Sequence, residues 1–258
     1  MLYAGSLVNV LEHELAPHFE AATGCTFEGF PGGSDELVSE IKGKVRRADV
    51  FVSATEAPDL ALEGSRNGNW ISWYETFARS PLVIAYNPHS RFASALRSKP
   101  WWQVVTERGF RLGRTDPKID PKGKLTVQAL EQASREHDDP ALSRLAHTTS
   151  GVFPEEALLG RLEAGQLDAG FFYEVEADAV KPRLPTISIS PISLSAAFTV
   201  TILAHSEHSA GAEAFVRYLL SAAAAARLRA AGLLPSGPTL HGRPGALPAS
   251  LRSLLSAR

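Results

Sequence analysis

Short apolar runs alternate with segments of helical periodicity along this chain, and that alternation constrains the fold more than any other feature of the sequence. The run Asp49–Ala54 has the apolar centre of a buried parallel strand, whereas residues 7–19 carry leucine or phenylalanine at every fourth position. Such alternation favours an α/β fold over a β-sandwich or a helix bundle. We therefore predict mostly parallel sheets flanked by helices.

The length of 258 residues corresponds to one or two domains, at about 150 residues per domain. Apolar runs at Pro81–Pro88 and Ala197–Ala204 enclose a segment that has its own alternation of strands and helices. The sequence therefore predicts two lobes, the first formed by residues 1–82 plus 198–258 and the second by residues 83–197. The two crossings between the lobes are expected to act as a hinge.

Charge and composition exclude several classes of protein. Lys plus Arg is 26 and Asp plus Glu is 28, and the resulting net charge of −2 lacks the cationic excess typical of proteins that bind nucleic acids or anionic membranes. Cys25 is the only cysteine, so neither an internal disulfide nor a cysteine-based zinc site is expected. No apolar run reaches the roughly 18 residues expected of a membrane-spanning helix.

The first residues, Met1–Ser6, have neither the basic nor the apolar region of a signal peptide. A single cysteine is compatible with the cytosol and equally with an exported protein that avoids thiols. The chain is therefore expected either to be cytosolic or to have lost a signal peptide.

Two predicted strand–helix turns share the same chemistry, because Gly5-Ser6 follows the first predicted strand and Gly33-Ser34 follows the second. A helix start offers unpaired backbone N–H groups and a partial positive charge, and glycine lets a ligand approach the backbone. Since the carboxyl ends of parallel strands meet at one edge of a sheet, the two turns are expected to converge on one small anion. Each serine alone is equally typical of an ordinary helix N-cap.

The second lobe offers three further candidate groups. Asp120–Gly123, which includes Lys122, forms a turn before a predicted helix, and Pro154 at another helix start leaves the amide near Glu155 unpaired. Tyr173 ends an apolar strand and carries a hydroxyl donor. Lys122 is expected either to help bind a divalent anion or to lie in solvent. A surface turn, a normal helix start and a half-buried tyrosine are the alternatives for these three groups.

Motifs typical of enzymes and metal sites do not occur in the sequence. His13 and His18 flank a glutamate, but Pro17 intervenes and the two histidines are one position further apart than on the zinc-binding HExxH helix. Neither a nucleophile elbow, a phosphate-binding loop nor a dinucleotide-binding glycine motif is present. We therefore predict a protein that is not an enzyme and that needs no cofactor and no metal site.

Several segments occur in an order and spacing typical of one family. They are Tyr3–Leu7, Gly32–Ser34, Ala48–Phe51, Gly113–Gly123, Glu163–Tyr173 and Gly232–Pro235. Together they resemble the molybdate/tungstate-binding proteins of ABC importers, and the resemblance covers about residues 2–236. It implies a two-lobed periplasmic-binding-protein fold that binds a tetrahedral oxyanion in the cleft between the lobes and delivers it to a membrane permease.

The resemblance also implies which residues bind the anion. Serine hydroxyls and neighbouring amides of the first lobe would donate to it, glycines would allow its close approach, and amides and a tyrosine hydroxyl of the second lobe would close over it. The implied ligand-binding residues are Gly5, Ser6, Gly33, Ser34, Asp120, Lys122, Glu155 and Tyr173.

One position departs from the family pattern. The tungstate-type branch of the family has an acidic metal ligand immediately before the strand-ending tyrosine, where this chain has Phe172, although Asp120 matches the branch's other acidic ligand. With one of the two carboxylates absent, the anion is expected to remain tetrahedral rather than to become six-coordinate.

The resemblance further implies a monomer that is periplasmic, or extracellular and lipid-anchored, and that has no nucleic-acid partner. Two alternatives stay open: a receptor for another oxyanion such as sulfate or phosphate, and a cytosolic ligand-sensing domain or enzyme. A receptor for hydrogen phosphate needs an acceptor for the ligand's proton, so Asp120 at the ligand would favour a protonated anion.

Overall fold

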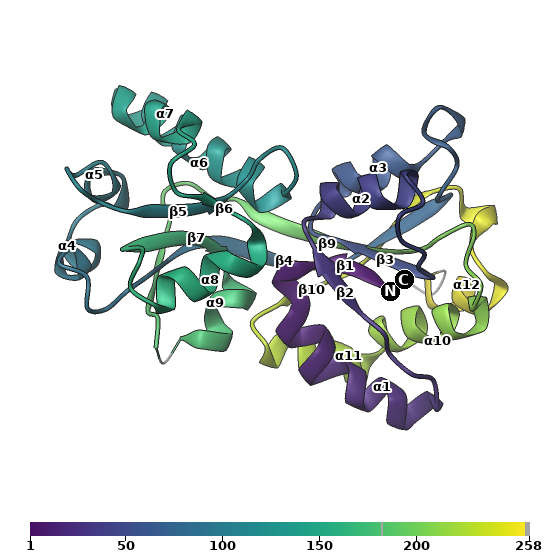
Figure 1. Cartoon of the computed structure of the whole chain (residues 1–258). Coiled ribbons are helices and arrows are strands. Elements are labelled where there is room, and N and C mark those ends of the chain that lie inside the picture. The colour runs from purple at the N-terminus through teal and green to yellow at the C-terminus, as the bar shows by residue number, and fades with distance from the viewer. Residues whose placement is uncertain (182, 256–258) are drawn as a thin grey trace. The chain divides into compact units, whose positions relative to one another are not determined.

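A computed structural model describes residues 1–181 and 183–255. The chain forms two compact units, unit 1 made of Met1–Ser80 with Ala197–Arg258 and unit 2 made of Pro81–Ala196, where the sequence placed the boundaries at 82/83 and 197/198. In each unit a β-sheet is flanked by helices, and this confirms the predicted α/β class (Figure 1). Among the described residues, no helix is both long and apolar enough to cross a membrane.

The sheet of unit 1 has a parallel core with antiparallel additions. Its strands are β1 (Leu2–Ala4), β2 (Phe30–Gly32), β3 (Val50–Ser53), β4 (Trp73–Tyr86), β9 (Ser195–Ile202) and β10 (Leu234–Gly242), of which β4 and β9 continue into unit 2. The strand order is β2-β1-β3-β9-β4, and β10 pairs with β4. β1 is parallel to β2 and to β3, whereas β9 and β10 are antiparallel to the strands they pair with, β3 and β4.

Helices cover both faces of the unit 1 sheet. They are α1 (Ala16–Thr23), α2 (Ser34–Lys42), α3 (Glu56–Leu62), α10 (Ser209–Leu219), α11 (Ala222–Ala230) and α12 (Ala249–Leu255). Helices α2 and α3 pack on one face, and α1, α10 and α11 lie on the other (Figure 1). The alanine-rich sequence predicts one helix over about Ala210–Ala231, but the structure has two: α10 ends at Leu219, and Ser221 caps α11 by accepting a hydrogen bond from the Ala224 N–H at 3.2 Å.

The first helical stretch is less regular than the sequence predicts. All four apolar residues of its repeat are buried, as expected. A 3-10 turn (Gly5–Leu7) and a π-helical segment (Asn9–Leu15) precede α1, and the Ala16 N–H bonds to the carbonyl of Leu11, five residues back. Pro17 has no N–H with which to continue the α-helical ladder, and this accounts for the wide turn before it.

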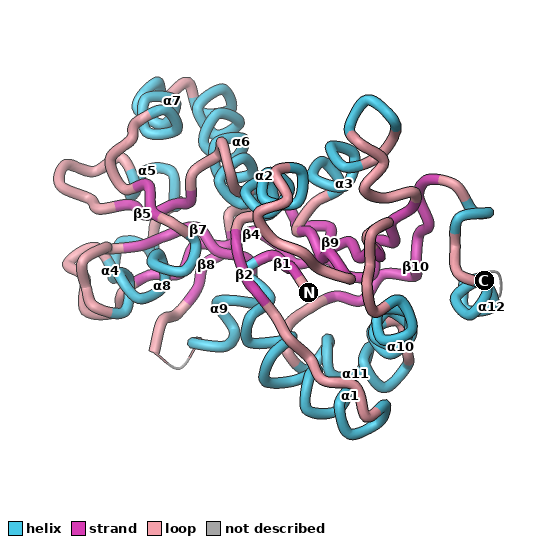
Figure 2. The backbone as a smooth tube through the Cα atoms, turned by 45° about the vertical axis from the view of Figure 1, so that its right-hand side comes forward, coloured by secondary structure: helices cyan, strands magenta, loops and turns pink. Residues whose placement is uncertain are grey.

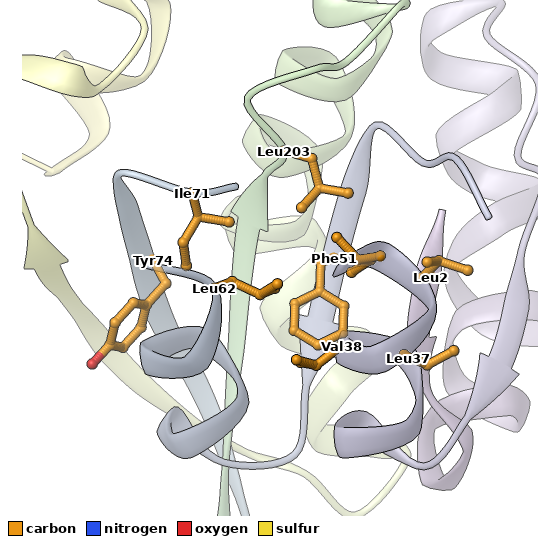
Figure 3. Packing of buried hydrophobic residues seen from close by; sticks show 9 residues of the cluster. Leu2, Leu37, Val38, Phe51, Leu62, Ile71, Tyr74 and Leu203 are labelled. Carbon is orange, nitrogen blue, oxygen red and sulfur yellow. The ribbon is translucent and has the colours of Figure 1, made fainter. Parts of the chain in front are cut away.

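One core cluster of unit 1 lies between the sheet and helices α2 and α3. Figure 3 shows Leu37 and Val38 of α2 close to Phe51 and Leu2 of the strands. The cluster comprises Leu2, Leu37, Val38, Ile41, Phe51, Leu62, Ile71, Tyr74 and Leu203. The spacing of Val38, Ile41 and Val45 in the sequence predicts one buried helix face, but α2 ends at Lys42 and the Val45 side chain is exposed.

Unit 2 repeats the plan with a smaller parallel core. Its own strands are β5 (Leu112–Thr115), β6 (Val152–Phe153), β7 (Ala169–Tyr173) and β8 (Thr186–Ser188). β5 is parallel to β6 and to β7, while β7 and β8 are antiparallel to β4. The sheet is therefore more mixed than the mostly parallel one predicted.

The helices of unit 2 also lie on both sides of its sheet. They are α4 (Ala93–Ser98), α5 (Trp101–Val105), α6 (Pro121–His137), α7 (Pro140–His147), α8 (Glu155–Glu163) and α9 (Glu174–Val180). Helices α6 and α7 lie on one side of β5 and β7, and α8 and α9 lie on the other (Figure 1). In both units strand ends lead directly into helices, as β2 does into α2 and β7 into α9 (Figure 2).

Candidate functional site

The three parallel strands of unit 1 end side by side. Ala4 of β1 pairs with Gly32 of β2, and Tyr3 pairs with Val52 of β3, so the turns that follow these strands lie at one edge of the sheet. The structure therefore brings the two predicted turns together. Neither serine is an N-cap, however: Ala4 and Gly33 take the cap positions, and no side chain caps either helix start.

Ser34 connects the outer two of these strand ends. Its side chain is 1% exposed, and its Oγ accepts a hydrogen bond from the Ala54 N–H at 3.2 Å. Ala54 directly follows β3, and β1 lies between β2 and β3 in the sheet. The Ser34 hydroxyl therefore reaches across the end of β1, where Gly5 and Ser6 begin the next turn.

The two serine hydroxyls can each donate a further hydrogen bond at this edge of the sheet. The Ser6 side chain is 5% exposed, and its Oγ has no hydrogen-bond partner among the described residues. The Ser34 Oγ accepts one bond, and the described part of the chain gives no acceptor for its proton. Buried polar groups are nearly always hydrogen-bonded, so an unpaired buried hydroxyl calls for an additional partner such as a ligand or a water.

The backbone conformation at the glycines of the two turns does not require glycine. Gly5 and Gly33 are not among the glycines with positive φ in the described chain, and Gly33 has extended backbone angles that any residue adopts. The missing side chain is then the property that matters, and the predicted close approach of a ligand to Gly5 and Gly33 stays a prediction.

In unit 2, Asp120 holds the turn between β5 and α6. The carboxylate is buried and accepts hydrogen bonds from the Gly123 N–H at 3.1 Å and the Thr115 hydroxyl at 2.8 Å. A Cβ on Gly123 would come within 2.6 Å of the Thr115 carbonyl oxygen, so only glycine fits there. Burial would raise the pKa of Asp120, but a hydrogen bond with the Glu155 carboxyl and the charge of Lys122 hold that pKa below its ordinary value.

The Lys122 side chain is buried, and its ammonium is paired with carboxyl groups. Its side chain is 1% exposed, and its Nζ contacts Oε1 of Glu155 at 3.0 Å and both oxygens of Glu176 at 2.6 and 2.9 Å. Burial would lower the pKa of Lys122, but the charges of Glu155, Glu176 and Asp120 raise it, so the ammonium stays charged. Of the two alternatives for Lys122, the structure excludes the solvated one, and a role at the anion stays a prediction.

Glu155 contributes a carboxyl group that the sequence analysis did not consider. Burial and the charge of Asp120 raise its pKa well above the ordinary value, and the protonated carboxyl can share its proton with Asp120. The family pattern leaves Asp120 as the only plausible carboxyl ligand for a six-coordinate metal centre, whereas the structure places the Glu155 carboxyl beside it. The expected role of the Glu155 backbone amide stays a prediction.

Tyr173 and Phe172 lie at the end of β7, and both are buried. The Tyr173 N–H donates to Glu176 Oε2 at 2.9 Å, and the Lys122 ammonium lies 5.7 Å from the centre of the Tyr173 ring. Phe172 belongs to the unit 2 core and its ring centre lies 5.3 Å from the same ammonium. The position before the tyrosine is therefore filled by a core side chain.

Glu176 is the functional candidate that the sequence analysis missed. It lies three residues after Tyr173, which is the spacing at which an acidic side chain bonds back to the residue that starts a helix. That spacing was visible in the sequence. Its second partner, Lys122, lies 54 positions away and could not be paired with it from the sequence.

Comparison with known proteins identifies the family to which this chain belongs. A family model described as bacterial extracellular solute-binding protein matches residues 1–234. The chain belongs to this family. Together with the relatives described below, this match confirms the resemblance to molybdate/tungstate-binding proteins.

One relative of this solute-binding protein is a putative ABC transporter molybdenum-binding protein of Haloferax volcanii, which is 34% identical over 208 residues that cover 78% of this chain and 65% of the relative. The chain thus spans slightly less than two thirds of that relative's length, and about half the length of an uncharacterized solute-binding protein of Methanoculleus marisnigri.

Two solved structures are similar to this solute-binding protein in fold. The periplasmic molybdate-binding protein of Azotobacter vinelandii has a TM-score of 0.69 at 19% identity, with 90% of this chain and 97% of that chain covered. The sulfate-binding protein SubI of Mycobacterium tuberculosis has a TM-score of 0.71 at 16% identity, with 91% and 85% covered. At these identities the likeness shows that the chain has the fold of periplasmic binding proteins.

Proposed function

We propose that this solute-binding protein binds molybdate or tungstate as a tetrahedral oxyanion and delivers it to the membrane permease of an ABC importer. The names of the Haloferax volcanii relative and of the Azotobacter vinelandii protein support a molybdenum oxyanion. The resemblance of the site segments to molybdate/tungstate-binding proteins supports the same ligand class.

The observation that carries the proposal is the pair of serines at the unit 1 edge. Ser6 offers a buried hydroxyl with no partner among the described residues, and Ser34 offers a hydroxyl proton beside it. A divalent oxyanion that stays fully ionised needs donors and no acceptor, and neutral hydroxyls meet that need. Gly5 and Gly33 complete the unit 1 part of the proposed site.

Unit 2 contributes the predicted donors of its own edge: the amides of the Asp120–Lys122 turn and of Glu155, and the Tyr173 hydroxyl. A divalent anion is repelled by ionised carboxylates. In unit 2 the Lys122 charge and the proton of Glu155 reduce that repulsion.

The cellular setting belongs to the same proposal. The protein works outside the cytoplasm, in the periplasm or at the cell surface with a lipid anchor, as a monomer that meets a membrane permease. It is a carrier without enzyme activity and without a cofactor, and a small inorganic oxyanion is its ligand.

A receptor for sulfate or phosphate is the second candidate, and the sulfate-binding neighbour in the fold comparison keeps it in the test. The hydrogen bonds of Asp120 argue against hydrogen phosphate as the ligand. Its carboxylate already takes part in hydrogen bonds with the Thr115 hydroxyl, the Gly123 N–H and Glu155. An acceptor that is already occupied in this way is poorly suited to a protonated ligand.

Calorimetric titration with molybdate, tungstate, sulfate and phosphate tests the proposal. Molybdate and tungstate should bind with similar affinity because they are nearly equal in size. Sulfate should bind several kcal/mol more weakly, because it is smaller and its hydrogen bonds would be longer. X-ray absorption on the molybdate complex should show four oxygen neighbours; six would mean that carboxyl groups ligate the metal.

Serine variants locate the site. Ser6→Ala and Ser34→Ala should each weaken molybdate binding by about 1–3 kcal/mol, the value of a hydrogen bond to a charged partner. Ser39→Ala is the matched control, because Ser39 is exposed on the same helix as Ser34 and bonds only to the Asp35 carbonyl. Wild-type affinity in both test variants would place the site elsewhere, and no binding of any of the four anions would refute the proposed function.

A further inference from the structure

Lys122 is connected to all the other candidate residues of unit 2, and this gives it a role that the proposed function does not require. Its ammonium is buried, and it lies on the first turn of α6, two residues after the N-cap Asp120. The helix start therefore carries both the turn with the predicted amide donors and the cation that contacts neighbouring helices.

The first connection leads to α8. Glu155 is the first residue of α8; its Oε1 contacts the Lys122 Nζ at 3.0 Å, and its protonated carboxyl donates a hydrogen bond to Asp120. Its side chain is 9% exposed, so solvent does not replace these contacts easily. The start of α8 is therefore fixed to the start of α6 by two side-chain contacts.

The second connection leads to α9. Glu176 accepts two contacts from the Lys122 Nζ, and its Oε2 also accepts the backbone N–H of Tyr173, which is the N-cap of α9. One carboxylate therefore joins the buried ammonium to the backbone of Tyr173. The Tyr173 ring lies against the same ammonium, 5.7 Å from centre to Nζ.

We propose that Lys122 is a positioning residue, which holds the starts of α6, α8 and α9 in one arrangement so that their donors fit one oxyanion. This inference rests on the proposed function for its ligand, but the arrangement it describes lies within unit 2. A lysine suits the role because one ammonium has three donors that can serve several carboxylates.

The charge of Lys122 matters as well as its contacts. The charged groups that face it are Asp120 at the N-cap of α6, Glu155 from α8 and Glu176 from α9, and the Tyr173 ring lies against it. Without the ammonium, the buried carboxyl groups lose their counter-charge and take up protons more readily. An anion beside them should then bind better at low pH, where they are neutral, than at high pH.

Amide hydrogen exchange tests the arrangement without any ligand. In Lys122→Met, exchange at the starts of α8 and α9 should rise about tenfold or more, because their side-chain ties are cut. Lys181→Met is the matched control: Lys181 is also ion-paired in unit 2, to Asp178 at 3.0 Å, but its side chain is 58% exposed. Glu176→Gln, which keeps an acceptor for Tyr173, is the milder second variant should Lys122→Met fold poorly.

Titration with molybdate tests the consequence for binding. Lys122→Met should bind about 10- to 100-fold more weakly, the loss seen when groups that orient ligands in metal sites are removed. The loss should grow between about pH 6 and about pH 8, whereas a purely structural defect would lower affinity equally at each pH. Adding Glu176→Gln to Lys122→Met should flatten this pH dependence without restoring wild-type affinity, because the helix starts stay untied.

The outcomes separate the two proposals. Unchanged exchange in folded Lys122→Met or Glu176→Gln would overturn the positioning role, whatever the anion affinity. Raised exchange at the helix starts in a protein whose wild type binds none of the four anions would support the arrangement and refute the proposed function. Wild-type affinity in the double variant would show that Lys122 acts only as a charge, and that also overturns the positioning role.

Discussion

Units 1 and 2 both bury carboxyl groups, but they neutralise them differently. In unit 1, Asp59 and Glu75 are fully buried; the Thr199 hydroxyl donates to Asp59, and neither oxygen of Glu75 has a hydrogen-bond partner among the described residues. Burial raises the pKa of Glu75 to about 7 and that of Asp59 to about 8. In unit 2, Asp120, Glu155 and Glu176 surround the buried ammonium of Lys122 instead.

The difference matters because a proton is available only below the pKa of its group, whereas an ammonium keeps its charge across the ordinary pH range. Unit 1 should therefore respond to pH, and unit 2 should respond to the loss of one side chain. The same contrast holds at the two candidate edges, where unit 1 presents neutral serine hydroxyls and unit 2 presents donors fixed by ion pairs.

The largest expected effect is that of Lys122→Met on stability. Removing one partner of a buried ion pair leaves charges uncompensated, so the free energy of unfolding should fall by about 3–5 kcal/mol. Urea denaturation at neutral pH measures the change. Lys181→Met should cost far less, because its ion pair is exposed and solvent screens it. Equal losses of unfolding free energy in Lys122→Met and Lys181→Met would show that the buried ion pairs contribute no more than the exposed one.

The next effect should appear in unit 1, with Glu75→Gln. The folded pKa of about 7 lies above the ordinary 4.5, so the folded protein holds a proton that the unfolded chain releases. The wild type should therefore lose stability as pH rises from about 4.5 to about 7, with the loss complete above that range. Glu75→Gln should be more stable than wild type by about 2 kcal/mol at pH 8, and closer to it at pH 5.

Denaturation over a pH series checks the Glu75 prediction. Asp59 should still add a slope up to about pH 8 in Glu75→Gln, because its own pKa is raised to that value. Parallel pH curves for wild type and variant would mean that Glu75 has a polar partner when ionised, and the two units would then differ less than described.

Much of the fold was predictable because its signals are local. The apolar run at 169–173 is β7, the turn at Asp120-Pro121 starts α6, and the apolar centre of 49–54 is β3. Where the local signal was weak, the prediction failed: the run Thr26–Phe30, which is followed by Pro31, predicts a strand, but the strand forms at Phe30–Gly32, because pairing with β1 fixes its place. β10 was missed, since its antiparallel pairing with β4 joins residues more than 150 positions apart.

The candidate site was predictable only in part. Glycine and serine after a strand are visible in the sequence, so Gly5, Ser6, Gly33 and Ser34 were found as a group. The partners of Lys122 were not, because no local pattern joins it to the carboxylates of α8 and α9, which follow 33 and 54 positions later. Side-chain pairing across elements is set by tertiary packing.

A smaller effect is expected from Ser34→Ala in the ligand-free protein. The Ser34 hydroxyl accepts the Ala54 N–H, and alanine would leave this buried donor without its partner. The free energy of unfolding should fall by about 1–2 kcal/mol. Urea denaturation without anion measures it, and Ser39→Ala again serves as the control on the same helix. No loss of stability would mean that the link between the ends of β2 and β3 contributes little.

The smallest effect is expected from Ser6→Ala, and its smallness is the informative part. The Ser6 hydroxyl is buried without a partner among the described residues, so removing it takes away no hydrogen bond and relieves an unsatisfied polar group. Without anion, the free energy of unfolding should stay within about 0.5 kcal/mol of wild type or rise slightly. With excess molybdate, the free energy of unfolding should rise in both proteins, but less in Ser6→Ala, because a ligand that binds more weakly stabilises the folded state less. Urea denaturation with and without molybdate measures the stability of the ligand-free protein and the gain on binding. A clear loss of stability in the ligand-free variant would show that Ser6 serves the fold, and the neutral edge of unit 1 would then depend on internal contacts as much as the charged edge of unit 2 does.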